Sequence, residues 1–379
     1  MTSDLLVEGP ENFPILRELN FLNHAGVAPI SGRAAQALRQ YAAEAETQAY
    51  YRSSWYDQVR RIKRATAKLI NADGVEEVAF VANTSTGLNM VAGGIDWVAG
   101  DNVVITNVEY PANRYPWENL KRLGVGLIEV TQDSHGRIDS EDVANAVTNR
   151  TRIVSVSHVQ YSSGFFMDLK PISDMVHRAG GYLCVDAIQS IGAVPVDVQA
   201  MGIDFLAADG HKWLLAPEGC GIFYCRRDLI ELLHPLVVGW MCMVDAGNYG
   251  DYRFEFEKDS RRFEPGSYNI PGIMALGASI ELLMEVGIDN VWSRIEALTS
   301  QLCTGLGRKG YRVFSPREDG QKSGIVAFQP PAGAGELQQI VAELEKKNIV
   351  IVVREGRLRA SPHYYNTPGQ IQALIDALP

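Results

Sequence analysis

Short apolar runs alternate with amphipathic stretches between Val78 and Cys225, and this alternation restricts the chain to few architectures. The runs contain little polar alternation, which is typical of strands that are buried on both faces. They lie at Val78–Ala82, Val103–Thr106, Gly126–Val130, Ile153–Val156, Tyr182–Val185, Phe205–Ala208 and Gly221–Tyr224. The stretches between them have the helical spacing expected of βα crossovers. The pattern therefore predicts an α/β fold whose mostly parallel sheet lies between two layers of helices.

The segments that flank this region are ordered differently. Apolar residues at helical spacing predict helices from Arg33 to Leu69, and Pro171 and Gly180-Gly181 mark the start and end of a helix within the alternating region. After about Asp259 we predict helices at Ile273–Glu285, Asn290–Lys309 and Gly335–Lys347, strands at Tyr311–Phe314, Gly324–Phe328, Ile349–Val353 and Arg357–Ala360, and a last helix from Thr367-Pro368. We expect an N-terminal segment over residues 1–20, a large domain over 21–260 and a small α+β domain over 261–379.

Charge and cysteine content exclude several classes of protein. The 379 residues include 35 Lys and Arg against 45 Asp and Glu, and the net charge of −10 argues against nucleic acid or an anionic membrane as the main partner. The five cysteines form no Cys-x-x-Cys pair, so neither a disulfide framework nor a metal site is predicted. Residues 1–13 lack the features of a signal peptide, and no apolar stretch is long enough for a membrane helix. We expect a cytoplasmic protein.

The strongest chemical signal comes from residues at the ends of two neighbouring apolar runs. Asp186 ends one run and Gln189 follows it, while His211 and Lys212 follow the next run. Ligands bind outside the carboxyl ends of parallel strands, so these four side chains are expected to face one crevice. A lysine amine forms a Schiff base with an aldehyde, and pyridoxal phosphate (PLP) is an aldehyde cofactor that also needs a carboxylate at its pyridine nitrogen. Taken alone, the Lys and Asp pair also fits structural roles at the rim of a sheet.

Two further segments favour the cofactor interpretation. Thr84 and Ser85 follow the first apolar run and open a helical stretch, where hydroxyl and N–H groups make an anion site, although either residue also suits a simple N-cap. Tyr110 follows the second run and has the ring needed to stack on an aromatic cofactor, although a tyrosine of the core fits the position as well.

Together these segments resemble those of the class V aminotransferase family, PLP enzymes of fold type I that include cysteine desulfurases, kynureninase and isopenicillin N epimerase. The resemblance runs from about Phe21 to about Ile371. It is carried, in the family's order, by Phe80–Thr86, Val185–Ser190, Ala208–Trp213, Glu264–Ser267 and Arg359–Thr367. It implies a large domain with a mostly parallel seven-stranded sheet between helices, a smaller α+β C-terminal domain, PLP as the cofactor and a homodimer.

The resemblance also implies which residues bind the cofactor. Lys212 would carry PLP as a Schiff base, the internal aldimine, and would then move protons at the α-carbon of an amino-acid substrate. Asp186 would pair with the pyridine nitrogen, Gln189 with the phenolic oxygen, and Tyr110 would stack on the ring. The phosphate would be held by Thr84, Ser85 and His211, and by Ser267 of the other subunit.

Substrate residues follow from the same resemblance. Arg359 would bind the substrate carboxylate, since a guanidinium forms two parallel hydrogen bonds with a carboxylate and an ammonium does not. Asn23 and His24 match a segment that borders the substrate, although His24 suits a hydrogen-bonded structural role equally well. Asn113 resembles a position near the cofactor ring.

Two departures from the family pattern bear on function. Asp209 stands where desulfurases usually have a serine on the phosphate, so we expect its carboxylate to point elsewhere or its backbone to make the contact. Desulfurases also carry a nucleophilic cysteine in a mobile loop before the carboxylate-binding arginine. Here the chain runs from Val353 directly to Arg359 without a cysteine, which argues against desulfuration by the usual persulfide route.

The resemblance implies a PLP-dependent enzyme that acts at the α-carbon of an amino acid, and we predict an aminotransferase. A C–S lyase or cysteine desulfurase-like enzyme and an epimerase remain open alternatives, because the cofactor serves all these reactions. A catalytically degenerate binding protein would be expected to lack Lys212, Asp186 or Arg359, and all three are present.

Overall fold

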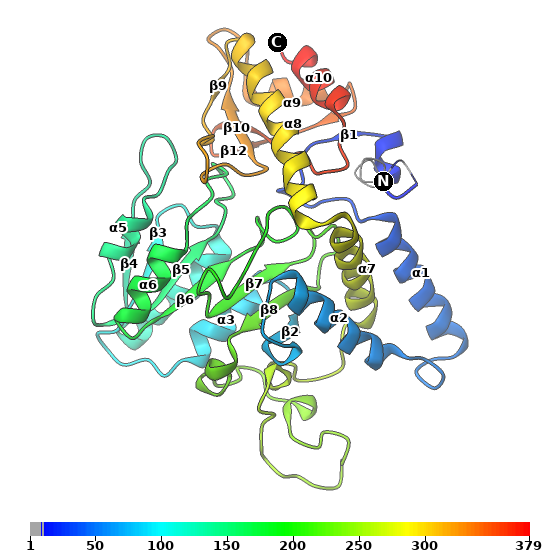
Figure 1. Ribbon diagram of the computed structural model, residues 1–379, viewed down its shortest axis with the longest axis vertical. Helices are drawn as coiled ribbons and strands as arrows, with labels where there is room; N and C mark the ends of the chain where they lie inside the picture. Colours follow the sequence, from blue (N-terminus) through cyan, green and yellow to red (C-terminus); the bar gives the residue numbers. More distant parts are fainter. Residues whose placement is uncertain (1–8, 10) are drawn as a thin grey trace.

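The computed structural model describes residue 9 and residues 11–379, and a seven-stranded sheet forms the centre of its larger part (Figure 1). Its strands are β2 (Val78–Val81), β3 (Asn102–Thr106), β4 (Gly126–Val130), β5 (Thr151–Ser157), β6 (Tyr182–Asp186), β7 (Phe205–Asp209) and β8 (Gly221–Cys225). They lie in the order β2-β8-β7-β6-β5-β3-β4, and the five strands from β7 to β4 pair in parallel. The prediction of a mostly parallel sheet is confirmed.

Strand β8 is the exception, since it runs antiparallel to both β7 and β2. Only residues 210–220 connect β7 to β8. That length is too short for the crossover that a parallel pair requires, so the chain reverses direction at this point. The same short connection contains His211 and Lys212, and it therefore holds them at the carboxyl end of β7.

Helices cover both faces of the sheet because its strands are apolar on both sides. Val103 and Ile105 of β3 pack on one side with α3 (Thr84–Gly94) and α4 (Tyr115–Glu118). Val104, between them, packs on the opposite side. That side is covered by α2 (Trp55–Leu69), α5 (Ser140–Asn145), α6 (Lys170–Arg178) and α7 (Ile270–Val286). This layering agrees with the prediction from the uninterrupted apolar runs.

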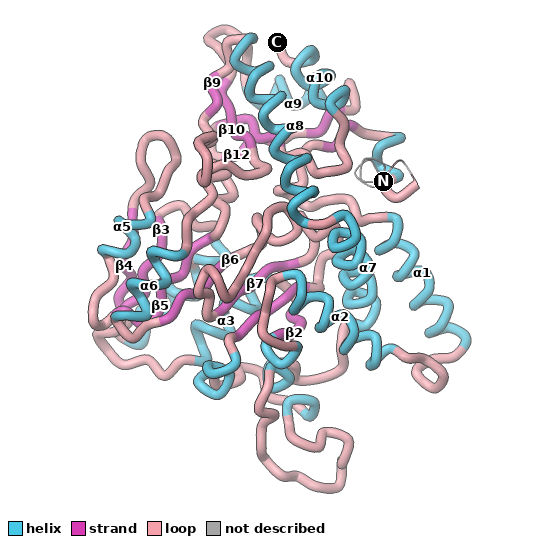
Figure 2. Tube along the Cα trace, viewed as in Figure 1, coloured by secondary structure: helices cyan, strands magenta, loops and turns pink. Residues whose placement is uncertain are grey.

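The C-terminal part forms a smaller unit with its own core, shown at the top of Figure 2. Its antiparallel sheet has the order β12-β13-β10-β9, with β9 (Arg312–Val313), β10 (Val326–Gln329), β12 (Val352–Arg354) and β13 (Arg357–Ala360). Helices α8 (Ile288–Arg308), α9 (Leu337–Glu345) and α10 (Pro368–Ala377) pack against it. The prediction of one strand over Ile349–Val353 is wrong. The segment divides into β12 and β11 (Ile349–Val350), and β11 instead pairs in parallel with β1 (Asn20–Phe21).

Helix α7 packs against α1 (Gly32–Thr47) and α2 beside the large sheet, and it meets α8 at a bend of 80°. Among the described residues no single helix is long and apolar enough to cross a membrane, although this bent pair passes on length and composition. Most of α7 is buried. The domain boundary near residue 260 stays a prediction, and most of the residues behind the signal-peptide expectation lie outside the described part of the chain.

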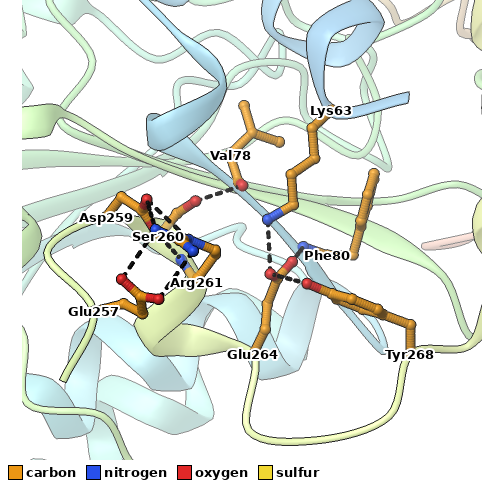
Figure 3. A network of polar contacts seen from close by, with 9 residues as sticks. All are labelled: Lys63, Val78, Phe80, Glu257, Asp259, Ser260, Arg261, Glu264 and Tyr268. Carbon is orange, nitrogen blue, oxygen red and sulfur yellow. Dashed lines mark hydrogen bonds and ion pairs between the residues drawn. The ribbon is translucent and has the colours of Figure 1, made fainter. Parts of the chain in front are cut away.

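A buried ion pair joins α2 to the segment that precedes α7 (Figure 3). Lys63 Nζ lies 2.7 Å from Glu264 Oε2, and both side chains are buried. Glu264 also accepts hydrogen bonds from the Phe80 N–H of β2 at 2.9 Å and from the Tyr268 hydroxyl at 2.8 Å. Since charges are buried in proteins only when paired and hydrogen-bonded, this network fixes the turn over residues 265–267 against the edge of the sheet.

Candidate active site

A cavity of about 480 Å³ opens at the carboxyl ends of β6 and β7. Its lining includes ten of the residues singled out above, namely Asn23, Thr84, Ser85, Tyr110, Asp186, Gln189, Asp209, His211, Lys212 and Arg359. They come from the large sheet, from the first turn of α3 and from β13 of the small unit. The structure thus brings together residues that are more than 300 positions apart in the chain.

Lys212 lies in the turn between β7 and β8, and its side chain is buried. Gly210 permits this turn, because a Cβ at that position would lie only 2.8 Å from the Cys220 carbonyl oxygen. Burial lowers the pKa of the Lys212 amine to about 8, and Arg359 adds to this effect, while the carboxylate of Asp186 opposes it. An amine with this pKa is partly neutral near pH 7 and is therefore able to act as a nucleophile or a base.

The Asp186 carboxyl terminates β6 at the floor of the cavity. Burial raises its pKa to about 7, although the Ile188 N–H donates a hydrogen bond to it at 3.0 Å and Lys212 also favours the ionised form. Gln189 lies one turn further on, where its Nε2 donates to the Ala25 carbonyl oxygen and its Oε1 accepts from the Trp213 indole at 2.8 Å. These bonds set the orientation of the Gln189 amide at the cavity wall.

The opposite end of the cavity is built for an anion. Helix α3 begins at Thr84 behind an Asn83 N-cap, and the first N–H groups of a helix lack acceptors within the helix. Thr84 and Ser85 add hydroxyl groups to this end of the cavity. His211 Nδ1 lies 3.0 Å from Asp209 Oδ2. The backbone N–H of Asp209 donates to the Thr84 hydroxyl at 2.9 Å, and Asp209 also lines the cavity, so its contact with a phosphate stays a prediction.

The small unit contributes a guanidinium. Arg359 is 1% exposed, and its Nη1 and Nη2 donate to the Tyr161 carbonyl oxygen at 2.7 Å and to Asn23 Oδ1 at 3.2 Å. Its Nε has no hydrogen-bond partner among the described residues, and no carboxylate neutralises the group. Burial lowers the pKa of Arg359 to about 9, with Arg354 adding to the shift. A buried guanidinium in this state favours an anionic ligand.

Tyr110 forms part of the cavity wall, with its ring centre 5.5 Å from Lys212 Nζ. The residue before it, Glu109, is buried and accepts hydrogen bonds from the Thr106 hydroxyl, Asn113 Nδ2, Gln160 Nε2 and both the N–H and hydroxyl of Ser157. Asn113 is fully buried in this network and does not line the cavity. The arrangement positions the backbone that carries Tyr110.

Besides Asn113, two of the predicted site residues stay outside the cavity. His24 is completely buried, with Nδ1 2.9 Å from the Ser361 carbonyl oxygen and Nε2 2.5 Å from the Tyr365 hydroxyl, and burial lowers its pKa well below the usual value. Its contacts are those of a structural histidine. Ser267 lies with Glu264 in a separate cavity of about 320 Å³, so in its own chain it does not reach the anion site.

Sequence reasoning missed two polar residues in the lining of the cavity, Tyr161 and Arg354. Tyr161 follows the end of β5, and the rule that directs attention to the carboxyl ends of strands would have found it. Arg354 ends β12 and faces the cavity only because the small sheet packs over the large one, so no local pattern indicates it.

No cysteine of the described chain lines the cavity. Cys184, Cys220, Cys225 and Cys242 are buried, and Cys303 is partly buried in the small unit. Burial raises the pKa of the Cys184, Cys220 and Cys225 thiols, which keeps them protonated and unreactive. Within the described residues there is also no cluster of three or more metal-binding side chains.

The cavity fits PLP and an amino acid by its distribution of charge. A buried carboxylate with raised pKa suits a pyridine nitrogen, because a proton shared between the two relieves the cost of burying Asp186. The α3 N-terminus suits a phosphate, and Lys212 lines the same cavity. The unneutralised Arg359 guanidinium suits the substrate carboxylate.

Comparisons with known proteins agree with this assignment. The model of the family described as Aminotransferase class-V matches residues 21–374. A probable cysteine desulfurase of Methanothermobacter thermautotrophicus is 33% identical over 97% of this chain and 96% of its own. An uncharacterized aminotransferase, YcbU of Bacillus subtilis, is 27% identical over 97% and 95%. The fold is similar to that of the cystine C–S lyase C-DES in complex with cysteine persulfide, with a TM-score of 0.88 at 24% identity over 97% and 98% of the two chains.

Proposed function

The chain belongs to the aminotransferase class-V family and is a PLP-dependent enzyme, and on this premise we propose that it cleaves the C–S bond of a cysteine-type amino acid by β-elimination. The similarity of nearly the whole chain to a probable cysteine desulfurase supports sulfur chemistry rather than the aminotransferase predicted from sequence alone. A second relative, a cysteine desulfurase of Escherichia coli, is 30% identical over 84% of the chain. Transamination becomes the alternative outcome of the test below.

One observation supports a β-elimination that forms no protein persulfide. Among the described residues, no cysteine lines the cavity. A protein persulfide requires a cysteine within reach of the substrate sulfur. Without one, sulfur leaves as a small molecule, and the reaction needs only water as a second reactant. Cysteine and water then give pyruvate, ammonia and hydrogen sulfide, without net oxidation or reduction.

The cofactor supplies an aldehyde that binds the substrate amine and a ring that withdraws electrons from the α-carbon. With PLP bound, Asp186 would pair with the pyridine nitrogen and favour its protonated form, because burial raises the pKa of this carboxyl to about 7. The α3 N-terminus, the Thr84 and Ser85 hydroxyls and His211 would hold the phosphate. Tyr110, in the wall of the same cavity, would pack against the ring face.

Lys212 moves the protons. Its neutral amine removes the proton from the α-carbon, the β C–S bond breaks with its electron pair on sulfur, and the protonated amine supplies a proton to the departing group. A pKa of about 8 suits both halves of this exchange, since general acid and base catalysis is most efficient when the pKa lies near the working pH. Arg359 binds the α-carboxylate and so orients the α-hydrogen towards Lys212.

The test is product analysis of the PLP-loaded enzyme with cysteine and cystine. We expect pyruvate and ammonia in equal amounts together with sulfide or a small-molecule persulfide, and no requirement for a 2-oxo acid. Lys212→Ala abolishes the reaction, whereas Cys242→Ser and Cys303→Ser retain it. Amino transfer to an added 2-oxo acid without sulfur release would replace the proposal with transamination, and loss of sulfur release in either cysteine variant would refute the thiol-free route.

We also propose that the enzyme is a homodimer. Ser267 belongs to a segment that resembles a phosphate-binding one, yet it lies in a different cavity from the anion site of its own chain. The nearby segment over residues 235–258 extends from the body, yellow-green at the bottom of Figure 1. It exposes Leu236, Val237, Trp240, Tyr249, Tyr252 and Phe254. An apolar surface of this kind is typical of an interface.

Sedimentation velocity tests the assembly. We expect twice the 41.7 kDa chain mass, and weaker PLP retention in Ser267→Ala without a change in the assembly. If the wild-type protein sediments as a monomer and still retains PLP, the dimer proposal is wrong.

A further inference from the structure

The β12–β13 hairpin occupies the segment in which desulfurases carry their cysteine-bearing loop. Its turn consists of Glu355 and Gly356, with φ angles of 46° and 68°. Two consecutive residues with positive φ are typical of a type I′ turn, and glycine adopts this conformation without strain. The connection is therefore a tight two-residue turn, and it places the end of β12 next to the cavity.

Contacts on both sides hold the hairpin. The Tyr161 hydroxyl, at the cavity rim, donates to Glu355 Oε1 at 2.9 Å. On the other strand, the Arg357 guanidinium lies 3.5 Å from the centre of the Phe314 ring, an attractive cation–π contact. Because both strands of the hairpin are anchored, Arg354 beside the turn has a defined position.

Arg354 faces the cavity in which Lys212 and Arg359 lie. Its charge is one of the causes that lower the pKa of both groups, after burial, in keeping with its place in the lining of the same cavity. The side chain is exposed, and its Nη1 donates to the carbonyl oxygen of the adjacent Val353 at 3.1 Å. Within the described part of the chain, Arg354 forms no ion pair that would neutralise it.

The charged groups of the cofactor and of a simple amino acid are all matched by other residues of the site, so none of them requires the Arg354 guanidinium. The cofactor phosphate belongs to the α3 end and its pyridine nitrogen to Asp186, while the α-carboxylate of an amino acid belongs to Arg359. Apart from the charged groups already described, the lining of the cavity consists of uncharged residues, including Tyr110, Tyr161 and Phe21. The positive charge of Arg354 therefore has no negatively charged partner in the cofactor or in the amino and carboxylate groups that all amino acids share.

We propose that Arg354 binds a second anionic group of the substrate, a carboxylate carried by its side chain or by its sulfur substituent. The proposal rests on the proposed function, since it places the amino acid in the same cavity. The planar guanidinium matches a carboxylate through two parallel hydrogen bonds, and its exposed position allows the distal end of a long substituent to reach it. The substrate class is thus an amino acid with an acidic substituent, in preference to cysteine itself.

Two thioethers test the preference with the PLP-loaded enzyme. S-carboxymethylcysteine and S-carbamoylmethylcysteine have the same size and differ in whether the distal group is a carboxylate or an amide. We expect kcat/KM to be about tenfold higher for the acid than for the amide, and we expect this difference to come from a lower KM for the acid. A tenfold effect is what hydrogen bonds to a charged group typically contribute. Arg354→Gln brings the ratio of the two kcat/KM values close to one, and Arg354→Lys restores part of the preference for the acid.

Arg312→Gln is the matched control, because Arg312 is an exposed arginine of β9 in the same small sheet and does not line the cavity. It is expected to keep the wild-type ratio. A wild-type ratio near one, or a preference for the acid that persists in Arg354→Gln, would overturn the proposal.

Binding of 2-aminoadipate and of its side-chain amide, which match the two thioethers in length but have no C–S bond, is measured by calorimetry on the same variants and separates this proposal from the proposed function. If 2-aminoadipate binds more tightly through Arg354 while neither thioether is cleaved, the C–S lyase assignment fails and the second anion site stands. If both thioethers are cleaved with equal efficiency, the anion site fails and the lyase assignment stands.

Discussion

The pKa of Lys212 makes the cofactor-binding reaction measurable as a function of pH. An ordinary lysine has a pKa of 10.5, and burial lowers that of Lys212 to about 8. At pH 7 the neutral fraction is then about one in ten, compared with about three in ten thousand for the ordinary side chain. Because only the neutral amine attacks an aldehyde, we expect the capture of PLP by the apoenzyme to be about 300-fold faster at this pH than capture by an unperturbed lysine of equal reactivity.

The assay mixes apoenzyme with PLP between pH 6 and 10, traps the product with borohydride and quantifies modified Lys212 by mass spectrometry. The rate is expected to rise with pH and level off above about 8, whereas the rate for Nα-acetyl-lysine amide, in which only the ε-amine is free, continues to rise towards 10.5. Two variants test the cause. Asp186→Asn removes a carboxylate that raises the pKa of Lys212, so the inflection moves to lower pH, and Arg359→Gln removes a cation that lowers it, so the inflection moves to higher pH. An inflection near 10, or shifts in the opposite directions, would refute this electrostatic account.

Three further variants test the supporting structure. Lys63→Met leaves the Glu264 carboxylate buried without its partner, so we expect the free energy of unfolding to fall by about 3–5 kcal/mol, which corresponds to a decrease of about 5 °C in Tm. The double variant with Glu264→Gln is expected to recover part of this loss. Calorimetry of the apoenzyme measures this loss, and an unchanged Tm would contradict it. Glu109→Gln places an amide N–H group against groups that already donate hydrogen bonds, so we expect a lower Tm. We also expect weaker PLP retention, because the adjoining Tyr110 is then less well positioned. PLP retention equal to that of the wild type would exclude a positioning role for Glu109. Arg359→Lys keeps the charge but loses the fork, so KM for every active amino acid is expected to rise about tenfold, and an unchanged KM would show that the carboxylate binds elsewhere.

Much of the fold follows from local patterns. Uninterrupted apolar runs indicate strands that are buried on both faces, and the layered sheet confirms this. The Thr367-Pro368 pair indicates a helix start, and Thr367 caps α10 with its side chain. The strand expected over Ile349–Val353 fails because a continuous apolar run does not reveal that its two halves pair with different sheets.

The residues of the candidate site also include some that local sequence patterns identify and others that they do not. Asp186, Lys212 and the first residues of α3 are identifiable because each follows an apolar run directly, so that their place at the rim of the sheet is a local property. The matches at Ser267 and His24 show the limit of this reasoning, since a motif does not state which cavity a side chain enters. The structure places Ser267 in a separate cavity and encloses His24 among hydrogen-bonding partners.

The sequence by itself determined the class of fold and the cofactor, and it placed Asp186, Lys212 and the start of α3 at one edge of the sheet, because strand burial, helix starts and the residues at strand ends depend on near neighbours in the chain. The tertiary structure alone decided what surrounds the substrate. Arg359 and Arg354 meet Lys212 only because the small sheet packs over the carboxyl edge of the large one. The pKa values of these groups depend on burial and on charges brought together from distant segments, and no local pattern in the chain encodes either.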